Sequence, residues 1–451
     1  MTLNSLTPAP TPTPRNRRAR IAKLIIAGVT VLCLGVAGLA AYVNWPDPYP
    51  VGAAASLPAG ERDPLWADRN TTVETSSHEK IWHDMNTALQ TQDRELFLSY
   101  ADGDAKGQLA LWWDNLSAIG WTTGYVSPNT DADGSQVVTI GVDLAFPANQ
   151  MRGSGAIDAG LILTQGFTYK ITTAGSDDDL RITSFVPGDV IMPWDDGKLY
   201  VERRDHVVLF ALEDERALVT EHIDEAERSA VETIDLATKM GGEIPQTGFA
   251  SGITGSDERF ERWRFGTEVP TEGKVDASAF ARPSFRPYQA SEIIDPKLAV
   301  GSETGGTTVI MGPGAAYDFR LVFIHEFAHA IHFTAAPELS WSYSKASMEG
   351  FARYAEYASG ASEFVAYPEL KNAVATLGAG AFADERFTME PDVHFAYDSA
   401  GSCYLFVAEN GGDPWALAVD AVTQGRDITD LAAETSPTLS VANWQQWVAG
   451  R

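Results

Sequence analysis

The stretch LVFIHEFAHAIHF, Leu321 to Phe333, places three histidines and one glutamate in an otherwise apolar run. Apolar residues fall on every side of the helix that this run predicts, so the helix must be largely buried. Buried imidazole and carboxylate groups are costly unless they are hydrogen-bonded or bind an ion. A fold for this chain must therefore supply these four polar groups with partners inside its core.

His325 and His329 are four residues apart, which places them on the same face of a helix. From there both imidazoles can reach one zinc ion at about 2.0–2.1 Å. Glu326 is displaced by roughly 100° around the helix, so it can contact a water molecule at the metal instead of sharing the coordination position. The spacing predicts a zinc site with Glu326 as general base. Two hydrogen-bonded core histidines are the alternative, because only three positions of the pattern are fixed.

A third protein ligand has to come from another segment, because catalytic zinc usually has three protein ligands and a water molecule. The metzincin pattern would need glycine at 332 and histidine at 335, where this chain has His332 and Ala335. Twenty residues after His329, the segment SMEGFARYAEY places Glu349 at the start of a helical pattern.

These segments resemble the gluzincins, zinc peptidases that combine a HExxH helix with a glutamate ligand on a second helix, and MEGFARYAEY is most similar to the M1-type aminopeptidases. The resemblance implies that Glu326 is the general base and that the zinc ligands are His325, His329 and Glu349. A later segment, HFAYDSAGSCYLF, resembles the M1 segment in which a tyrosine precedes a helix of small residues. It implies that Tyr397 donates a hydrogen bond to the oxyanion of the tetrahedral intermediate.

The resemblance covers about Asp318 to Phe406 and departs from the M1 pattern at one place. Those aminopeptidases carry Gly-x-Met-Glu-Asn before the zinc helix, to bind the amino terminus of the substrate. This chain has GTTVIMGPGAAYDF there, without a glutamate. Endopeptidase or another trimming activity is therefore expected instead of aminopeptidase activity. The TTVIM strand could pair with an extended substrate backbone.

Two further polar residues of this region have alternative interpretations. His332 could line the pocket, but we expect a hydrogen-bonded core histidine. Glu356 follows Glu349 by seven residues and shares its helix face, so it could orient a metal ligand, or it could be a solvated carboxylate. Asp318 is expected to cap the zinc helix.

The exported part of the chain predicts an α+β fold in two domains. In residues 77–196, helical patterns come first, and strands with alternating apolar residues follow, for example VVTIGVDLAF. This order resembles the cone-shaped NTF2-like fold. Residues 197–451 contain the strand HVVLFAL, a long amphipathic helix that ends near Gly241, and the gluzincin-like metallopeptidase segments.

The start of the chain predicts a membrane anchor. Residues 1–23 form a basic tail, residues 24–43 carry no charge and are long enough for a transmembrane helix, and residues 44–76 form a linker rich in Pro, Gly and Ala. The basic cluster precedes the span, which predicts a cytoplasmic N-terminus. A cleaved signal peptide is the alternative, although its apolar region is usually shorter. The net charge of −28 argues against nucleic acid as a partner.

Taken together, these patterns predict a single-pass protein of the cell membrane with an extracellular, Zn²⁺-dependent metallopeptidase domain that acts on peptide or protein substrates. A surface binding or scaffold protein with a structural or inactive zinc site is the alternative from another class. The presence of all four key residues argues against it, because a degenerate enzyme usually loses a ligand or the base. A zinc hydrolase acting on a non-peptide amide shares every motif and stays open.

Overall fold

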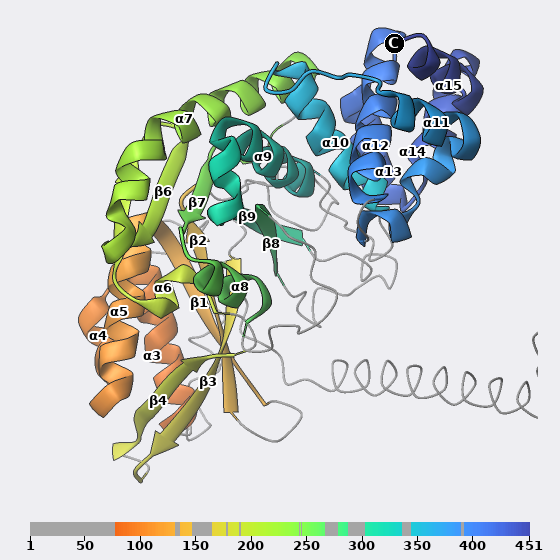
Figure 1. Cartoon of the computed structure of the whole chain (residues 1–451). Helices are drawn as coiled ribbons and strands as arrows, with labels where there is room; N and C mark the ends of the chain where they lie inside the picture. Colours follow the sequence, from red (N-terminus) through yellow and green to blue (C-terminus); the bar gives the residue numbers. More distant parts are fainter. Residues whose placement is uncertain are drawn as a thin grey trace, which may run out of the picture. The chain divides into compact units, whose positions relative to one another are not determined.

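The structure of the chain, a computed structural model, describes most residues from Ser77 onward (Figure 1). The described ranges are 77–130, 136–146, 165–176, 179–188, 191–242, 244, 246–266, 278–286, 303–335, 344–388 and 392–451. The predicted basic tail, transmembrane helix and linker lie outside these ranges. Within them, no helix combines the length and the apolar character needed to cross a bilayer. The α+β class is confirmed, as a small antiparallel sheet, a mixed sheet and a helical region.

In the first part helices come first and strands follow, as predicted, and the strands form a four-stranded antiparallel sheet. Its elements are α3 (Ser77–Thr91), α4 (Arg94–Leu98), α5 (Gly103–Ile119), β1 (Trp121–Thr130), β2 (Gln136–Leu144), β3 (Gln165–Ala174) and β4 (Arg181–Pro187). Each strand pairs with the next one along the chain. β1 was not predicted, because Gly124 and Pro128 interrupt its apolar pattern. The similarity to the NTF2-like fold stays a prediction.

The second part is built around a mixed five-stranded sheet of order β5-β6-β7-β9-β8. Its strands are β5 (Leu199–Arg203), β6 (Val207–Leu212), β7 (Phe249–Ile253), β8 (Ala279–Arg286) and β9 (Glu303–Met311). The central strands β6, β7 and β9 run parallel, and the outer strands β5 and β8 are antiparallel to their neighbours. Every residue of β6 and β7 is buried, as expected for parallel strands that are covered on both faces.

The position of β9 corrects one expectation. Val309 of β9 pairs with Ser251 of β7 on one side and with Ala281 of β8 on the other. The TTVIM segment therefore lies inside the sheet, and the prediction that it pairs with a substrate is wrong. The outer strand at this end is β8, which was not predicted because a proline and two arginines interrupt its sequence AFARPSFR.

Two helices of the second part pack beside this sheet. α7 (Arg216–Lys239) contacts β5 and β6, and α9 (Phe319–Ala335) contacts α7, β8 and β9. Val219, Ile223 and Ala230 on the predicted apolar face of α7 are buried in a core cluster that α9 shares. α7 ends before Gly241, whose φ of +81° is a conformation that glycine adopts without strain.

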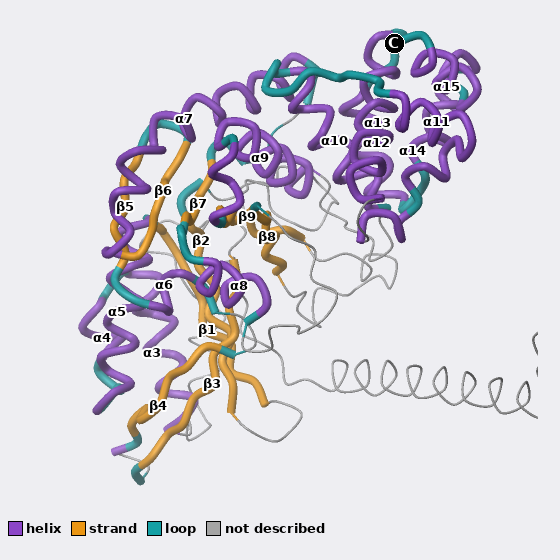
Figure 2. The backbone as a smooth tube through the Cα atoms, in the orientation of Figure 1, coloured by secondary structure: helices purple, strands orange, loops and turns teal. Residues whose placement is uncertain are grey.

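The C-terminal part is helical (Figure 2). Its α-helices are α10 (Lys345–Ala358), α11 (Pro368–Leu377), α12 (Asp392–Glu409), α13 (Pro414–Gln424), α14 (Ile428–Thr435) and α15 (Val441–Ala449). Short 3₁₀ helices lie between them at η5 (Gly378–Phe382), η6 (Asp384–Thr388) and η7 (Pro437–Leu439). α10 packs against both α9 and α12, and thereby connects the sheet region with the other C-terminal helices.

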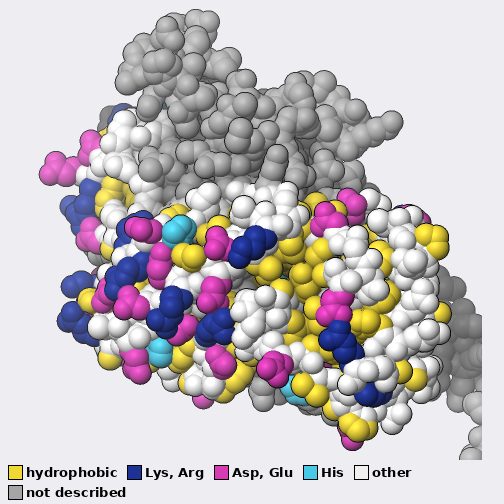
Figure 3. All heavy atoms as spheres, turned by 90° about the horizontal axis from the view of Figure 1, so that it is seen from above, with side chains coloured by type: hydrophobic (Ala, Val, Ile, Leu, Met, Phe, Trp, Pro, Cys, Tyr) yellow, Lys and Arg dark blue, Asp and Glu magenta, His cyan; other side chains and the backbone are white. Residues whose placement is uncertain are grey.

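The two sheets share one hydrophobic core cluster. It includes Trp112 and Tyr169 from the first part together with Phe210, Trp263 and Ile310 from the second. The segment between the sheets contains the short helix α6 (Pro193–Asp196), and η3 (Glu213–Glu215), η4 (Pro313–Tyr317) and α8 (Asp257–Phe265) complete the described elements. On the face seen in Figure 3, Lys and Arg side chains are interspersed with Asp and Glu despite the acidic net charge.

Candidate metal centre

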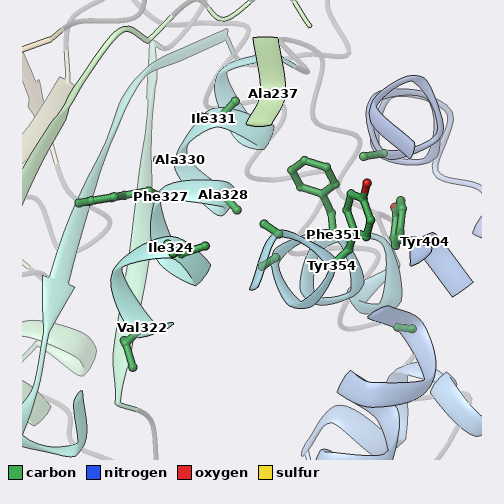
Figure 4. Packing of buried hydrophobic residues seen from close by; sticks show 14 of the residues in the cluster. Ala237, Val322, Ile324, Phe327, Ala328, Ala330, Ile331, Phe351, Tyr354 and Tyr404 are labelled. Carbon is green, nitrogen blue, oxygen red and sulfur yellow. The ribbon is translucent and has the colours of Figure 1, made fainter. Parts of the chain in front are cut away.

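The helix that carries the histidines, α9, is held against the sheet by aromatic packing. Phe327 stacks on Phe249 of β7 with ring centroids 4.0 Å apart and an angle of 8° between the planes. Val322, Ile324 and Ala328 are also buried in the cluster shown in Figure 4. The backbone N–H of Leu321 donates to Oδ1 of Asp318 at 3.0 Å, which confirms the predicted cap. The position of α9 is therefore fixed by its apolar residues and its first turn.

His325 and His329 project from this helix toward one point. Their Nε2 atoms are 3.1 Å apart, and the two rings are nearly perpendicular, at 83°. α10 brings Glu349 to the same point, with Oε2 at 3.3 Å from Nε2 of His325 and 3.2 Å from Nε2 of His329. The three predicted ligands therefore converge, and they form a group that could hold a metal ion.

The dimensions of this group fit a tetrahedral ion. Two ligand atoms that are each about 2.0–2.1 Å from zinc lie roughly 3.3 Å apart when the angle between them is tetrahedral. The three observed separations of 3.1, 3.2 and 3.3 Å agree with that value. Two imidazoles and one carboxylate are also a ligand set of catalytic zinc sites, which leave a fourth position open.

The protonation of His325 supports the same assignment. Its Nδ1 atom lies 2.7 Å from Oε1 of Glu356, so Nδ1 carries a proton, and Nε2 is the atom that faces Glu349 and His329. Nε2 of His325, Nε2 of His329 and Oε2 of Glu349 face one another in a buried space, where a bound proton or a metal ion stabilises the arrangement. Nδ1 of His329 is buried without a hydrogen-bond partner among the described residues.

The pKa values of the metal-free group show that His325 binds a proton tightly and that Glu349 stays charged. Burial opposes protonation of His325, but its hydrogen bonds to Glu349 and Glu356 outweigh that effect and raise its pKa to about 10. Burial also disfavours the charged form of Glu349, yet His329 and His325 hold its pKa well below the usual range. A metal ion therefore has to compete with the proton that His325 binds.

Glu326, the predicted general base, lies beside this group. Its side chain is buried, with 6% of the residue exposed, and Oε2 has no hydrogen-bond partner among the described residues. Burial raises the pKa of its carboxyl group, and the charges of His329 and His325 oppose the rise. A carboxylate oxygen next to a cation site, free to accept a proton, is what base catalysis needs.

Tyr397, the predicted oxyanion donor, comes from α12. Its ring stacks on that of His325, with centroids 5.9 Å apart and an angle of 22°. Burial raises the pKa of its hydroxyl group well above the ordinary value, and the neighbouring carboxylate of Glu349 adds to the rise. The hydroxyl therefore stays protonated and can donate a hydrogen bond. The structure brings all five predicted residues together, and their catalytic roles stay predictions.

Burial also decides between the alternative interpretations of Glu356 and His332. Glu356 is a buried carboxylate that contacts His325, so it is not a solvated residue. A carboxylate in this position orients a metal-binding imidazole and fixes its tautomer. His332 is fully buried and hydrogen-bonds through Nε2 to the carbonyl oxygen of Ala418 at 2.8 Å, as expected for a core histidine. Burial lowers its pKa to about 4.

Sequence reasoning missed three charged residues near the centre. Arg353 of α10 forms an ion pair with Glu356, and it also contacts Asp398 of α12. The spacing of three residues between Arg353 and Glu356 could have indicated their pairing, but Asp398 is 45 residues away in sequence. Burial raises the pKa values of Glu326 and Tyr397, and the charge of Arg264, from α8, opposes that rise; no motif points to Arg264.

Comparison of the sequence with protein-family models gives no match, and comparison with curated proteins gives none either.

Proposed function

We propose that the protein is a membrane-anchored zinc metallopeptidase whose catalytic domain lies outside the cytoplasm. The observation that carries this proposal is the triangle of His325, His329 and Glu349, whose dimensions fit tetrahedral zinc. The neighbouring Glu326, with an unpartnered oxygen, supplies the second component that a zinc hydrolase requires.

In this proposal each residue of the centre has one task. A zinc ion held by the three ligands would supply a Lewis acid that activates water and polarises the substrate carbonyl. Glu326 accepts a proton from the attacking water and delivers it to the leaving nitrogen. Tyr397 donates its hydroxyl hydrogen to the oxygen that becomes negatively charged. Glu356 holds the ring of His325 in position through Nδ1.

A peptide substrate is favoured by the sheet next to this centre. β8 is the outer strand beside β9, and among the described strands it pairs only with β9. A free strand edge can bind an extended peptide backbone by strand addition. The chain also lacks the glutamate that would bind a free amino terminus in the segment before α9. We therefore propose cleavage within peptides in preference to removal of single N-terminal residues.

The membrane anchor rests on sequence alone. The uncharged residues 24–43 and the basic residues before them support a single span with a cytoplasmic N-terminus. The catalytic domain would then act on peptides or proteins at the outer face of the cell membrane.

The proposal is tested by a cleavage profile on a mixed peptide library with the zinc-loaded full chain. Glu326→Gln serves as the blank, because it should bind zinc and lose turnover by a factor of 10³ or more, the order expected when the base is removed. Cuts that the wild type makes and the blank does not make would support a peptidase, and their positions would separate internal from terminal cleavage.

Two results would contradict the proposal. Turnover by Glu326→Gln near that of the wild type would exclude Glu326 as the base. A wild type that holds one zinc ion per chain and cuts nothing would favour the binding or scaffold protein, or an amide substrate other than a peptide.

A further inference from the structure

Arg353 lies between two carboxylates that belong to different helices. Its Nη1 atom contacts Oε2 of Glu356, one turn further along α10. Its Nε and Nη2 atoms lie 3.0 and 2.9 Å from Oδ1 of Asp398 on α12. The planar guanidinium thus uses both of its edges, which a lysine ammonium cannot do.

Asp398 is held in place by more than this ion pair. The hydroxyl of Tyr357 donates to Oδ1 of Asp398 at 3.0 Å, and the hydroxyl of Tyr367 donates to Oδ2 at 3.1 Å. Both carboxylate oxygens are therefore engaged, and 15% of the side chain is exposed. A carboxylate fixed in this way is a rigid anchor for the guanidinium of Arg353.

The stem of Arg353 is fixed as well. Its aliphatic part lies over Gly401 of α12, where an added Cβ atom would be 2.6 Å from Cγ of Arg353. The guanidinium also lies over the ring of Tyr357, 4.9 Å from its centroid. The side chain of Arg353 is therefore restricted along its whole length, and its charged end has one available position.

Through Glu356, the contacts of Arg353 extend to the metal centre. Oε2 of Glu356 accepts a hydrogen bond from Arg353. Oε1 of Glu356 accepts one from Nδ1 of His325, at 2.7 Å. Only 3% of its side chain is exposed, so water cannot replace either partner easily. The orientation of the carboxylate that contacts His325 is consequently set by Arg353.

We propose that Arg353, anchored by Asp398, is a positioning residue for the metal centre: it fixes Glu356, which in turn fixes the ring of His325. The inference rests on the proposed function only in so far as the centre binds zinc. An outer-shell partner of a metal-binding histidine typically changes metal affinity 10–100-fold when it is removed. The alternative is that the ion pair only stabilises the packing of α10 on α12.

The test measures the zinc dissociation constant of the full chain by competition with a chelator. Arg353→Met keeps the stem but loses both contacts, so zinc should bind about 10-fold more weakly, the lower end of the range for a partner that contacts the histidine itself. Arg353→Lys and Asp398→Asn should each weaken binding by a smaller, measurable factor. The double variant Arg353→Met with Asp398→Asn should bind zinc like Arg353→Met alone, because both substitutions interrupt the same chain of contacts.

Arg320→Met is the matched control. Arg320 of α9 pairs with Glu232 of α7 at 2.9 Å, and it donates to the carbonyl oxygens of Ser359 and Gly360 just after α10. It resembles Arg353 as a cross-link between helices but does not contact Glu356. Its loss should lower thermal stability while zinc affinity stays within about twofold of the wild type. The visible absorption of the cobalt-loaded protein should change in Arg353→Met and not in Arg320→Met.

The outcomes separate this inference from the proposed function. If the wild type binds zinc and cuts no peptide, the peptidase proposal fails and the zinc affinities still decide the role of Arg353. If the wild type binds no zinc, both proposals are overturned. Wild-type zinc affinity in Arg353→Met, together with lower stability, would show that the pair is structural only. If that variant does not fold, wild-type affinity in Arg353→Lys and Asp398→Asn would overturn the inference equally.

Discussion

At the scale of single residues, the three histidines of α9 differ although they share one apolar helix. His325 and His329 face Glu349, and the hydrogen bonds of His325 to Glu349 and Glu356 raise its pKa to about 10. His332 contacts a backbone carbonyl instead, and burial lowers its pKa, so it is neutral at pH 7. The same side chain therefore has a metal-binding or a packing role according to the partner that tertiary structure places beside it.

The hydroxyl group of Tyr397 can be tested separately from its ring. Tyr397→Phe keeps the ring that stacks on His325, so zinc content should stay at the wild-type level. Loss of one donor to the oxyanion should lower kcat by about 10²–10³, with little change in KM. Steady-state kinetics on a peptide that the wild type cleaves, with zinc content measured in the same samples, checks this. A kcat within threefold of the wild type would exclude Tyr397 as the donor.

At the scale of elements, the centre depends on the close approach of α10 and α12. A Cβ atom at Gly350 of α10 would lie 2.9 Å from Cβ of Ala400 and 3.1 Å from its backbone carbon. Gly401 of α12 similarly leaves room for Arg353. These contacts bring Glu349, from the start of α10, and Tyr397, from α12, to the same point.

Gly350→Ala should therefore separate the two helices and lower the free energy of unfolding by about 1–3 kcal/mol, a typical cost of overpacking. Gly107 of α5 is the matched control, because it is an exposed helical glycine with no atom within 4 Å of an added Cβ. There, alanine should raise the free energy of unfolding by up to about 1 kcal/mol through its higher helix propensity. Urea unfolding followed by circular dichroism measures both. Equal effects of the two substitutions would mean that the α10–α12 contact is not tight.

At the scale of the whole molecule, the two sheets are joined by a continuous core. Nδ2 of Asn115, on α5, donates to the carbonyl oxygens of Trp194 and Gly197, and Oδ1 accepts from the backbone of Leu199 in β5. Asp195, in the same segment, accepts from the hydroxyl of Tyr169 and from the backbone N–H of Met192. The polar groups of the Asn115 and Asp195 side chains are therefore paired at this junction, and we expect the described residues to unfold as one unit.

Asp195 should make the stability of the whole molecule depend on pH. Burial raises the pKa of Asp195 to about 7. Between pH 4 and 7 the folded state then retains a proton that the unfolded state has lost, so the free energy of unfolding falls as pH rises through this window. A shift of roughly three units corresponds to up to about 4 kcal/mol. His332 acts in the opposite direction below about pH 6.5, because the unfolded state binds the proton there.

The comparison of wild type with Asp195→Asn isolates the contribution of Asp195 to the pH dependence of the free energy of unfolding, because the contribution of His332 is present in both proteins. The free energy of unfolding of the wild type, relative to the variant, should fall by about 2–4 kcal/mol between pH 4.5 and 8 and stay constant above pH 8. Urea unfolding at several pH values measures it. A difference that does not change with pH would show that Asp195 titrates normally in the folded protein.

Several features could be predicted from the sequence because they depend on local order. The spacing of His325 and His329 is a property of the helix itself, and the apolar pattern of α7 dictates which of its faces is buried. The α+β class followed from the change between helical and alternating patterns. Strands with a proline or a glycine inside, β1 and β8, were missed because their pairing depends on neighbours and not on their own pattern.

By itself, the sequence determined which residues are able to bind a cation and where the two candidate helices lie along the chain. Tertiary structure decided the rest: that Glu349 meets the two histidines, that Glu356 is buried against His325, and that Asp398 anchors Arg353. The separation of 45 residues between Arg353 and Asp398 is bridged only by the packing of α10 on α12. Helix periodicity acts over a few residues, whereas the burial of charged side chains depends on which distant segments the core brings together.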